Sequence, residues 1–243
     1  MFSLTVCKIV IYKAFIDSAF CSGQRVDNYQ RKERTALKEE YKTVLKEASA
    51  ELVEKRSRFI ASVKPVRTET EALEYLETLK KKYWDARHNV YAYIIEENNI
   101  QRYSDDGEPA GTAGVPVLDI IKKEGLSNLI VVVTRYFGGI LLGTGGLVRA
   151  YSKSAKMGID AAQPVTITLC REVVISCDYT LLGRVQSECA ASGFTVCDTA
   201  YADAVKISLL VPVGDVERFT KDIFDKTNGK IGIELGETGY NQI

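Results

Sequence analysis

The chain has 243 residues, of which 46% are hydrophobic and 26% are charged, and its formal net charge is zero. This composition is ordinary for a globular protein with one large domain or two small ones, and it gives no global electrostatic argument for binding nucleic acid. The charges are unevenly distributed, because residues 164–243 hold 7 of the 32 Lys and Arg residues and 11 of the 32 Asp and Glu residues. Residues 1–163 are therefore mildly basic, and the remainder is mildly acidic.

Cysteine and histidine usage does not indicate a metal site. The chain has a single histidine, and no two of its six cysteines are spaced as CxxC, so a zinc-binding framework is not expected. The six are Cys7, Cys21, Cys170, Cys177, Cys189 and Cys197. We predict that they are reduced, in a cytoplasmic protein with neither metal nor cofactor.

The first residues are apolar but lack the pattern of a targeting or membrane segment. Lys8, Lys13 and Asp17 interrupt the apolar run, and the sequence nowhere approaches the ~18 consecutive apolar residues that a membrane span requires. Residues 22–42 are polar and charge-dense, which is typical of a solvated linker or of the beginning of a helix. We expect residues 1–40 to be an extension of the fold that need not be ordered.

Regular elements follow along the chain. A capping box at residues 68–71 and apolar residues at helical spacing up to Tyr83 predict a helix. Residues 89–95 predict a strand, residues 114–125 a short helix, and the apolar, β-branched run at residues 129–137 a buried strand. A long helix is expected from about Thr144 to before Pro164. Its apolar or small stripe consists of Leu147, Ala150, Tyr151, Ser154, Ala155, Gly158, Ile159 and Ala162.

The remainder predicts the element order strand–helix–strand–strand–helix–strand, which is a ferredoxin-like unit. A strand in residues 166–179, a helix ending at Gly193, two strands joined by a turn at residues 201–203, a second helix and a final strand make up this order. We therefore predict an α+β protein with two domains, residues 41–163 and residues 164–243.

A glycine-rich stretch joins the predicted buried strand to the long helix and has the parts of an anion site. Glycines allow close approach of a ligand to the backbone, helix N-termini attract negative charge, and arginine donates in pairs. The alternative is that the glycines only permit close packing and a left-handed turn. The candidate phosphate- or nucleic-acid-binding residues are Arg135, Tyr136, Gly138, Gly139, Gly143, Thr144, Gly145, Gly146, Arg149 and Lys153.

An acidic loop, "YSDDGEPAGTAG" at residues 103–114, supplies a second set of candidates. Asp105, Asp106 and Glu108, together with His88, could act as general acid and base or hold a divalent metal. Their spacing matches no diagnostic catalytic motif, and Asp-Gly is also a favoured turn dipeptide. A Cys–His enzyme is not expected, since no cysteine lies in the segment that contains His88. These residues therefore favour a protein without enzymatic activity.

The sequence resembles the IMPACT family in its bacterial, YigZ-type form. The resemblance is carried by "RYSDDGEPAGTAGVPVL" and "VVVTRYFGGILLGTGGLVRAY", preceded by "RSRF" at residues 56–59 and "DARH" at residues 85–88, and it runs from about Tyr41 to the C-terminus. It implies a first domain like the second domain of a small-subunit ribosomal protein and domain IV of elongation factor G. It also implies a ferredoxin-like second domain resembling domain V of that factor, and it selects strands for residues 41–66.

The resemblance implies a role in the regulation of translation. In eukaryotic relatives, the family member restrains the amino-acid-starvation kinase by competing for its activator protein. We hypothesise a cytoplasmic regulator whose partners are RNA, the ribosome or a regulatory protein. Two alternatives stay open at this point, a metal-assisted hydrolase that uses the acidic loop and a protein-docking module that uses the second domain.

Overall fold

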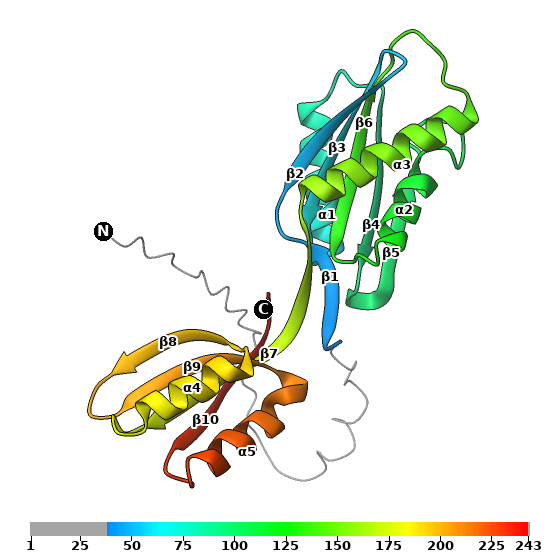
Figure 1. The fold of residues 1–243 in the computed structure, drawn as a ribbon. Coiled ribbons are helices and arrows are strands. Elements are labelled where there is room, and N and C mark those ends of the chain that lie inside the picture. The colour runs from blue at the N-terminus through cyan, green and yellow to red at the C-terminus, as the bar shows by residue number, and fades with distance from the viewer. Residues whose placement is uncertain (1–37, 243) are drawn as a thin grey trace, which may run out of the picture. The chain divides into compact units, whose positions relative to one another are not determined.

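The computed structural model describes residues 38–242, and the predicted extension at residues 1–40 lies almost entirely outside them. The described chain forms two compact units (Figure 1). Residues 41–166 form the N-terminal unit, and residues 38–40 with 167–242 form the C-terminal unit. The division falls within strand β1 (Glu40–Val44) and within strand β7 (Pro164–Cys177). The α+β class with two units is confirmed.

The N-terminal unit is built on an antiparallel sheet in the order β2-β3-β6-β4-β5. Its strands are β2 (Ala48–Glu54), β3 (Ser57–Pro65), β4 (His88–Ile95), β5 (Ile100–Ser104) and β6 (Leu129–Tyr136). Central strand β6 is a continuous apolar run because helices cover both faces of the sheet. A 3-10 turn at Glu97–Asn99 joins β4 to β5.

Helix α1 (Glu69–Lys82) covers one face of this sheet, and helices α2 (Gly114–Lys123) and α3 (Thr144–Ala161) cover the other (Figure 1). Thr68 caps α1 by accepting a hydrogen bond from Glu71 N at 3.2 Å. The Glu71 carboxylate reaches back to Arg67 N, one residue earlier than a capping box prescribes. The predicted stripe of α3 is confirmed, since all eight of its residues are buried.

The C-terminal unit has the predicted order β7-α4-β8-β9-α5-β10. These elements are β7, α4 (Leu182–Ser192), β8 (Thr195–Tyr201), β9 (Val205–Pro212), α5 (Val216–Lys226) and β10 (Gly232–Asn241). The antiparallel sheet runs β10-β7-β9-β8, with β1 also paired to β7. Helices α4 and α5 share one apolar core with the sheet, and a short turn at Val213–Asp215 precedes α5. This is a ferredoxin-like topology.

Two segments differ from the expectation. Residues 40–42 begin strand β1, although their charge density indicated a linker or a helix. Strand β5 was not predicted, because it has five residues and three of them are exposed, so it lacks an apolar alternation. Elsewhere the predicted helices and strands are confirmed, and the resemblance was right to select strands for residues 41–66. Within residues 38–242, no helix is long and apolar enough to cross a membrane.

Candidate functional site

The sequence motifs meet at one end of the N-terminal unit, which we call the loop end. Strand pairing establishes this, because Arg58 pairs with Tyr136, His88 with Arg135 and Tyr91 with Ser104. The β2–β3 turn, the α1–β4 connection, the acidic loop and the β6–α3 loop therefore leave the sheet at the same end (Figure 1). The loop end comprises residues 54–58, 83–88, 105–113 and 137–149.

A buried ion pair lies beneath the loop end. Arg135 Nη1 donates to Glu108 Oε1 at 2.5 Å, and the side chains are only 7% and 4% exposed. The Tyr151 hydroxyl on α3 donates to the same oxygen at 2.9 Å. Burial, followed by the charge of Glu108, raises the pKa of Tyr151 well above its usual range. The pair thus joins strand β6, the acidic loop and helix α3.

Arg135 is enclosed rather than presented to solvent. Its guanidinium lies 5.4 Å from the Phe59 ring centroid and 5.7 Å from that of Phe137, and its Nη2 lies 3.4 Å from the Ser57 hydroxyl. Its Nε has no hydrogen-bond partner among the described residues. The residue is 5% exposed, so it presents little surface to an external phosphate, and phosphate binding by Arg135 stays a prediction. It shares a sheet face with apolar residues and is committed to Glu108.

His88 and Asp106 connect strand β4 to the acidic loop. The His88 Nδ1 atom lies 2.7 Å from the Asp106 carbonyl oxygen, and the Asp106 carboxylate accepts from Asn89 N at 2.5 Å. His88 Nε2 lies 3.8 Å from Glu108 Oε1. His88 therefore stands at the edge of the buried pair and holds the turn at Asp106 against the sheet.

Asp105 caps helix α2 with its side chain. Its two carboxylate oxygens accept hydrogen bonds from the N–H groups of Gly111, Ala113 and Gly114, at 2.8 to 3.0 Å. The N–H groups of Ala113 and Gly114 would otherwise be unsatisfied at the beginning of the helix. All three carboxylates of the acidic loop are thus engaged within the protein, and in residues 38–242 no cluster of His, Cys, Asp and Glu is arranged to hold a metal. This geometry does not favour the hydrolase hypothesis.

Gly138 is required by a close backbone approach. A Cβ atom there would lie 2.0 Å from the carbonyl carbon of Arg56, and Gly138 N donates to the Ser57 hydroxyl at 3.2 Å. The β6–α3 loop is therefore pressed against the β2–β3 turn. Gly139 and Gly143 have φ values of 81° and 71°. These values lie in the left-handed region, which glycine adopts readily because it has no Cβ.

The remaining candidates lie around the N-terminus of α3. Its first residues, Thr144, Gly145 and Gly146, have no side-chain cap from Gly143 and no acidic residue in the first turn. Arg149 Nη1 would lie 3.7 Å from a Cβ placed on Gly145, so the guanidinium folds back over this turn. Lys153 is exposed but lies one helical turn further along α3.

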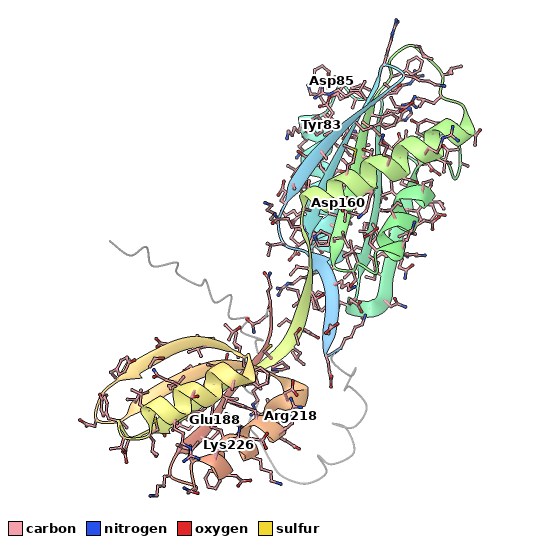
Figure 2. The ribbon with its side chains drawn as sticks, in the orientation of Figure 1. Tyr83, Asp85, Asp160, Glu188, Arg218 and Lys226 are labelled. Atoms are coloured by element: carbon pink, nitrogen blue, oxygen red, sulfur yellow. The ribbon has the colours of Figure 1, made fainter. Side chains whose placement is uncertain are left out.

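Tyr136 has a local role on the other sheet face. Its hydroxyl donates to Asp85 at 2.8 Å, and the Arg58 guanidinium lies 5.8 Å from its ring centroid. Asp85 and Tyr83 are labelled in this region in Figure 2. Burial and the bond to Asp85 raise the pKa of Tyr136. Tyr136 therefore anchors the α1–β4 connection.

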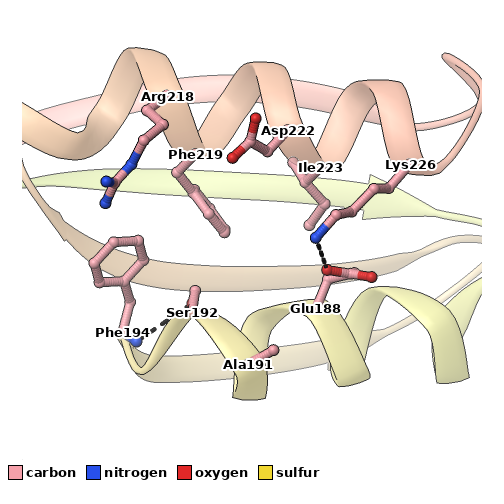
Figure 3. A pocket seen from close by; sticks show the side chains of 9 residues that line it. All are labelled: Glu188, Ala191, Ser192, Phe194, Arg218, Phe219, Asp222, Ile223 and Lys226. Carbon is pink, nitrogen blue, oxygen red and sulfur yellow. Dashed lines mark hydrogen bonds and ion pairs between the residues drawn. The ribbon is translucent and has the colours of Figure 1, made fainter.

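The C-terminal unit contains a groove of about 350 Å³ between α4 and α5 (Figure 3). Phe194 and Phe219 form its apolar wall, with ring centroids 5.2 Å apart and ring planes at 88°. The Lys226–Glu188 ion pair, at 2.6 Å, bridges the two helices. Arg218 is paired with Asp215 at 2.7 Å. The charged residues that line the groove are Glu188, Arg218, Asp222 and Lys226, whose charges sum to zero, so the groove has no net charge with which to select a ligand.

The described cysteines have the features of structural residues. Cys170, Cys177 and Cys189 are buried, and all four described cysteines are free thiols. Burial raises the pKa of Cys189 to about 11 and raises those of Cys170 and Cys177, which keeps the thiols protonated and poorly nucleophilic. Cys7 and Cys21 lie outside the described residues.

Some residues of the loop end were missed by sequence reasoning. Lys55 and Arg56 form the β2–β3 turn, and no turn signal marks them because neither is Asn, Asp or Gly. Trp84 is 83% exposed, but a lone aromatic residue after a helix has no distinguishing pattern. Tyr151 was expected only as part of an apolar stripe, whereas its hydroxyl also bonds Glu108.

Comparison with known proteins confirms the resemblance. Residues 55–159 match the family model described as the Impact N-terminal domain, and residues 175–230 match a domain of unknown function, DUF1949. A crystal structure described as that of a hypothetical protein is 28% identical, with a TM-score of 0.53, and the match covers 83% of this chain and 98% of that one.

Bacterial relatives match over most of their length. IMPACT family member YvyE of Bacillus subtilis is 43% identical over 201 residues, covering 82% of this chain and 93% of that protein. IMPACT family member YigZ of Escherichia coli is 31% identical over 180 residues, covering 73% and 88%. Protein IMPACT of Rattus norvegicus is 38% identical over 100 residues, covering 39% and 31%. With two domains matched and relatives of this identity and coverage, the chain belongs to the IMPACT family.

Proposed function

We propose that this protein is a cytosolic, non-enzymatic regulator associated with translation, and that it binds RNA through the loop end of its N-terminal unit. Membership of the IMPACT family supports the regulatory role. The loop end supports RNA as the ligand, because several of its exposed cations make no ion pair, whereas its three aspartates and Glu108 are hydrogen-bonded within the protein.

The observation that carries the proposal is a set of exposed cations without ion-pair partners. Within residues 38–242, Lys55, Arg56, Arg87 and Arg149 are exposed and make no ion pair. Arg149 folds back over the uncapped first turn of α3. A cation at the positive end of a helix is unfavourable unless an anion is shared between them. A phosphate group would satisfy both the guanidinium and the helix N–H groups.

Exposed apolar side chains lie among these cations. Trp84 is 83% exposed, Phe137 is 42% exposed and Leu141 is 83% exposed. Aromatic rings interleaved with Lys and Arg are the usual means of holding single-stranded nucleic acid, since bases stack on the rings while cations follow the phosphates. We therefore expect single-stranded RNA to bind more tightly than duplex RNA.

The test is the affinity of the full chain for a single-stranded RNA oligonucleotide over a salt series. Quenching of Trp84 fluorescence supplies a second readout, because the chain contains one tryptophan. Each lost phosphate contact should reduce the slope of log K against log salt by about 0.7. Arg149→Ala should show this reduction, and Arg184→Ala, at an exposed position on α4, should not. Absence of salt-dependent binding, or identical binding by Arg149→Ala, would contradict the proposal.

A protein partner is the second candidate. Strand β8 lies at an edge of the C-terminal sheet, and Val196 and Tyr201 on it are 46% and 62% exposed. Such an edge can pair with an extended segment of another chain. Crosslinking of the full chain in cell extract, followed by mass spectrometry, distinguishes a protein partner from RNA. Protein crosslinks concentrated at β8 favour this candidate, and RNA crosslinks at the loop end count against it.

A further inference from the structure

The β2–β3 turn has a backbone conformation that its residues do not favour. Eight non-glycine residues in the described chain have positive φ values, and five of them are Asn or Asp, which tolerate this conformation. The other three are Lys55, Arg56 and Gln163. Lys55 and Arg56 are consecutive, with φ values of 47° and 66°.

These two residues are the whole of a tight hairpin turn, since Glu54 pairs directly with Ser57. A two-residue turn with positive φ at both positions favours Asn-Gly, because these residues adopt the left-handed conformation at little steric cost. Lys and Arg offer the turn no such advantage. Their presence indicates that the side chains, and not the backbone preference, are what this position requires.

The surroundings hold the turn in its strained conformation. Seven residue pairs between β2 and β3 lead into it. Gly138 of the β6–α3 loop lies against the backbone of Arg56, so closely that a Cβ would come within 2.0 Å of its carbonyl carbon. The Ser57 hydroxyl that follows the turn accepts a hydrogen bond from Gly138 N. The turn is therefore clamped to the glycine-rich loop, and its cations are held in a fixed place.

The charges of the turn are directed outward. Both residues are exposed, and neither has an ion-pair partner within residues 38–242. The neighbouring Arg58, in contrast, is paired with Glu51 at 2.8 Å. Phe137 follows β6 directly and is exposed beside the clamped loop. Two cations without an ion-pair partner, next to an exposed ring, are suited to a phosphate-linked chain whose bases are unstacked.

We propose that the Lys55–Arg56 turn is the phosphate-contacting tip of the RNA site and that its backbone strain is retained for this contact. The inference rests on the proposed function, which it deepens by assigning the backbone phosphates of single-stranded RNA to two particular side chains. Residues that stabilise the backbone of this turn should then weaken RNA binding, because they lack the two cationic side chains.

The test replaces the turn with the residues that its backbone favours. In the Lys55→Asn/Arg56→Gly variant of the full chain, the urea midpoint of the N-terminal unit should rise, while affinity for a single-stranded RNA oligonucleotide should fall roughly tenfold near 0.1 M salt. The slope of log K against log salt should decrease by about 1.4, for two lost phosphate contacts. A Lys55→Ala/Arg56→Ala variant should lose affinity without the rise in midpoint.

A matched control removes the same charge elsewhere in this unit. Lys122 and Lys123 are exposed in the last turn of α2, which begins at the loop end and runs away from it. Lys122→Ala/Lys123→Ala should leave the salt slope unchanged. If the control lost as much RNA affinity and salt slope as the turn variant, the effect would be one of bulk charge, and the inference would be overturned. Wild-type binding that the Asn-Gly turn does not weaken would also overturn it, yet leave the proposed function intact. Absence of wild-type binding would instead contradict the proposed function.

Discussion

The two units of this protein treat buried polar groups differently. Of the eleven buried polar or charged residues in the described chain, ten lie in the N-terminal unit, including the charged pair Glu108 and Arg135. The C-terminal unit has only Thr227, whose hydroxyl bonds carbonyl groups of its own helix. Its core is otherwise built from apolar side chains and two cysteines.

The difference indicates that the two units depend on different interactions. Apolar packing stabilises the C-terminal unit but fixes no particular loop. In the N-terminal unit, the ion pair and the Tyr151 hydroxyl tie the acidic loop to strand β6 and helix α3. A buried ion pair is by itself weak evidence for a gain in stability. We infer that the polar network serves to position the loop end.

The largest expected effect follows from breaking the buried pair. Glu108→Ala leaves Arg135 charged, buried and unpaired, and should destabilise the N-terminal unit by about 3–5 kcal/mol. The double variant Glu108→Leu/Arg135→Met replaces the pair with apolar groups and should recover most of that loss. Urea unfolding, followed by hydrogen exchange in each unit, measures both. A Glu108→Ala variant as stable as the wild type would show that the pair is not required.

A comparable effect is expected in the C-terminal unit from loss of packing alone. Phe219 is 7% exposed and contacts Phe194 edge to face, so Phe219→Ala should cost about 3–4 kcal/mol in that unit. Exchange rates in the N-terminal unit and affinity for RNA should remain at wild-type values. Weaker RNA binding by a folded Phe219→Ala protein would show that the C-terminal unit takes part in the site.

A smaller effect separates the glycines of the β6–α3 loop. Gly138→Ala forces the loop away from the backbone of Arg56 and should cost about 1–3 kcal/mol, as overpacking does. Gly145→Ala is the matched control, because its Cβ would meet only the end of the Arg149 side chain, at 3.7 Å. Thermal unfolding of the two variants should differ by several degrees. Equal midpoints would mean that the loop is not clamped to the turn.

The smallest effect concerns alkaline pH. Burial holds the pKa of Tyr151 above its unfolded value of 10.0, so the folded state keeps a proton that the unfolded state loses above that pH. Stability should therefore fall as pH rises from about 10. Tyr151→Phe removes this ionisation, loses about 1 kcal/mol from the bond to Glu108 at neutral pH, and should show a shallower decline. Urea unfolding midpoints between pH 8 and 11 measure the decline in stability of both proteins. An equally steep decline in the wild type and in Tyr151→Phe would count against a buried Tyr151.

The fold was largely predictable because its elements are long and periodic. The stripe of α3 was identified residue by residue, since an 18-residue amphipathic helix repeats its pattern several times. Strand β5 was missed because its exposed residues at the sheet edge carry no such pattern. The ferredoxin-like order followed from six elements separated by clear turns.

The site was less predictable because it depends on which side chains face inward. The motif residues were identified, and Arg135 was predicted to bind a phosphate, but the continuous apolar run of β6 does not reveal which of the two sheet faces each of its residues occupies. Strand pairing places it opposite Phe59, on the sheet face that α2 and α3 cover. Lys55 and Arg56 could not be found by turn chemistry, since their turn departs from the residues that such a turn favours.

The most direct test of the central claim is the hydrogen-exchange footprint of a single-stranded RNA oligonucleotide on the full chain. We predict slower exchange at the loop end, in residues 54–58, 83–88 and 137–149, and no change across α4 and α5. Protection confined to the C-terminal unit, or no protection at saturating RNA, would contradict the account.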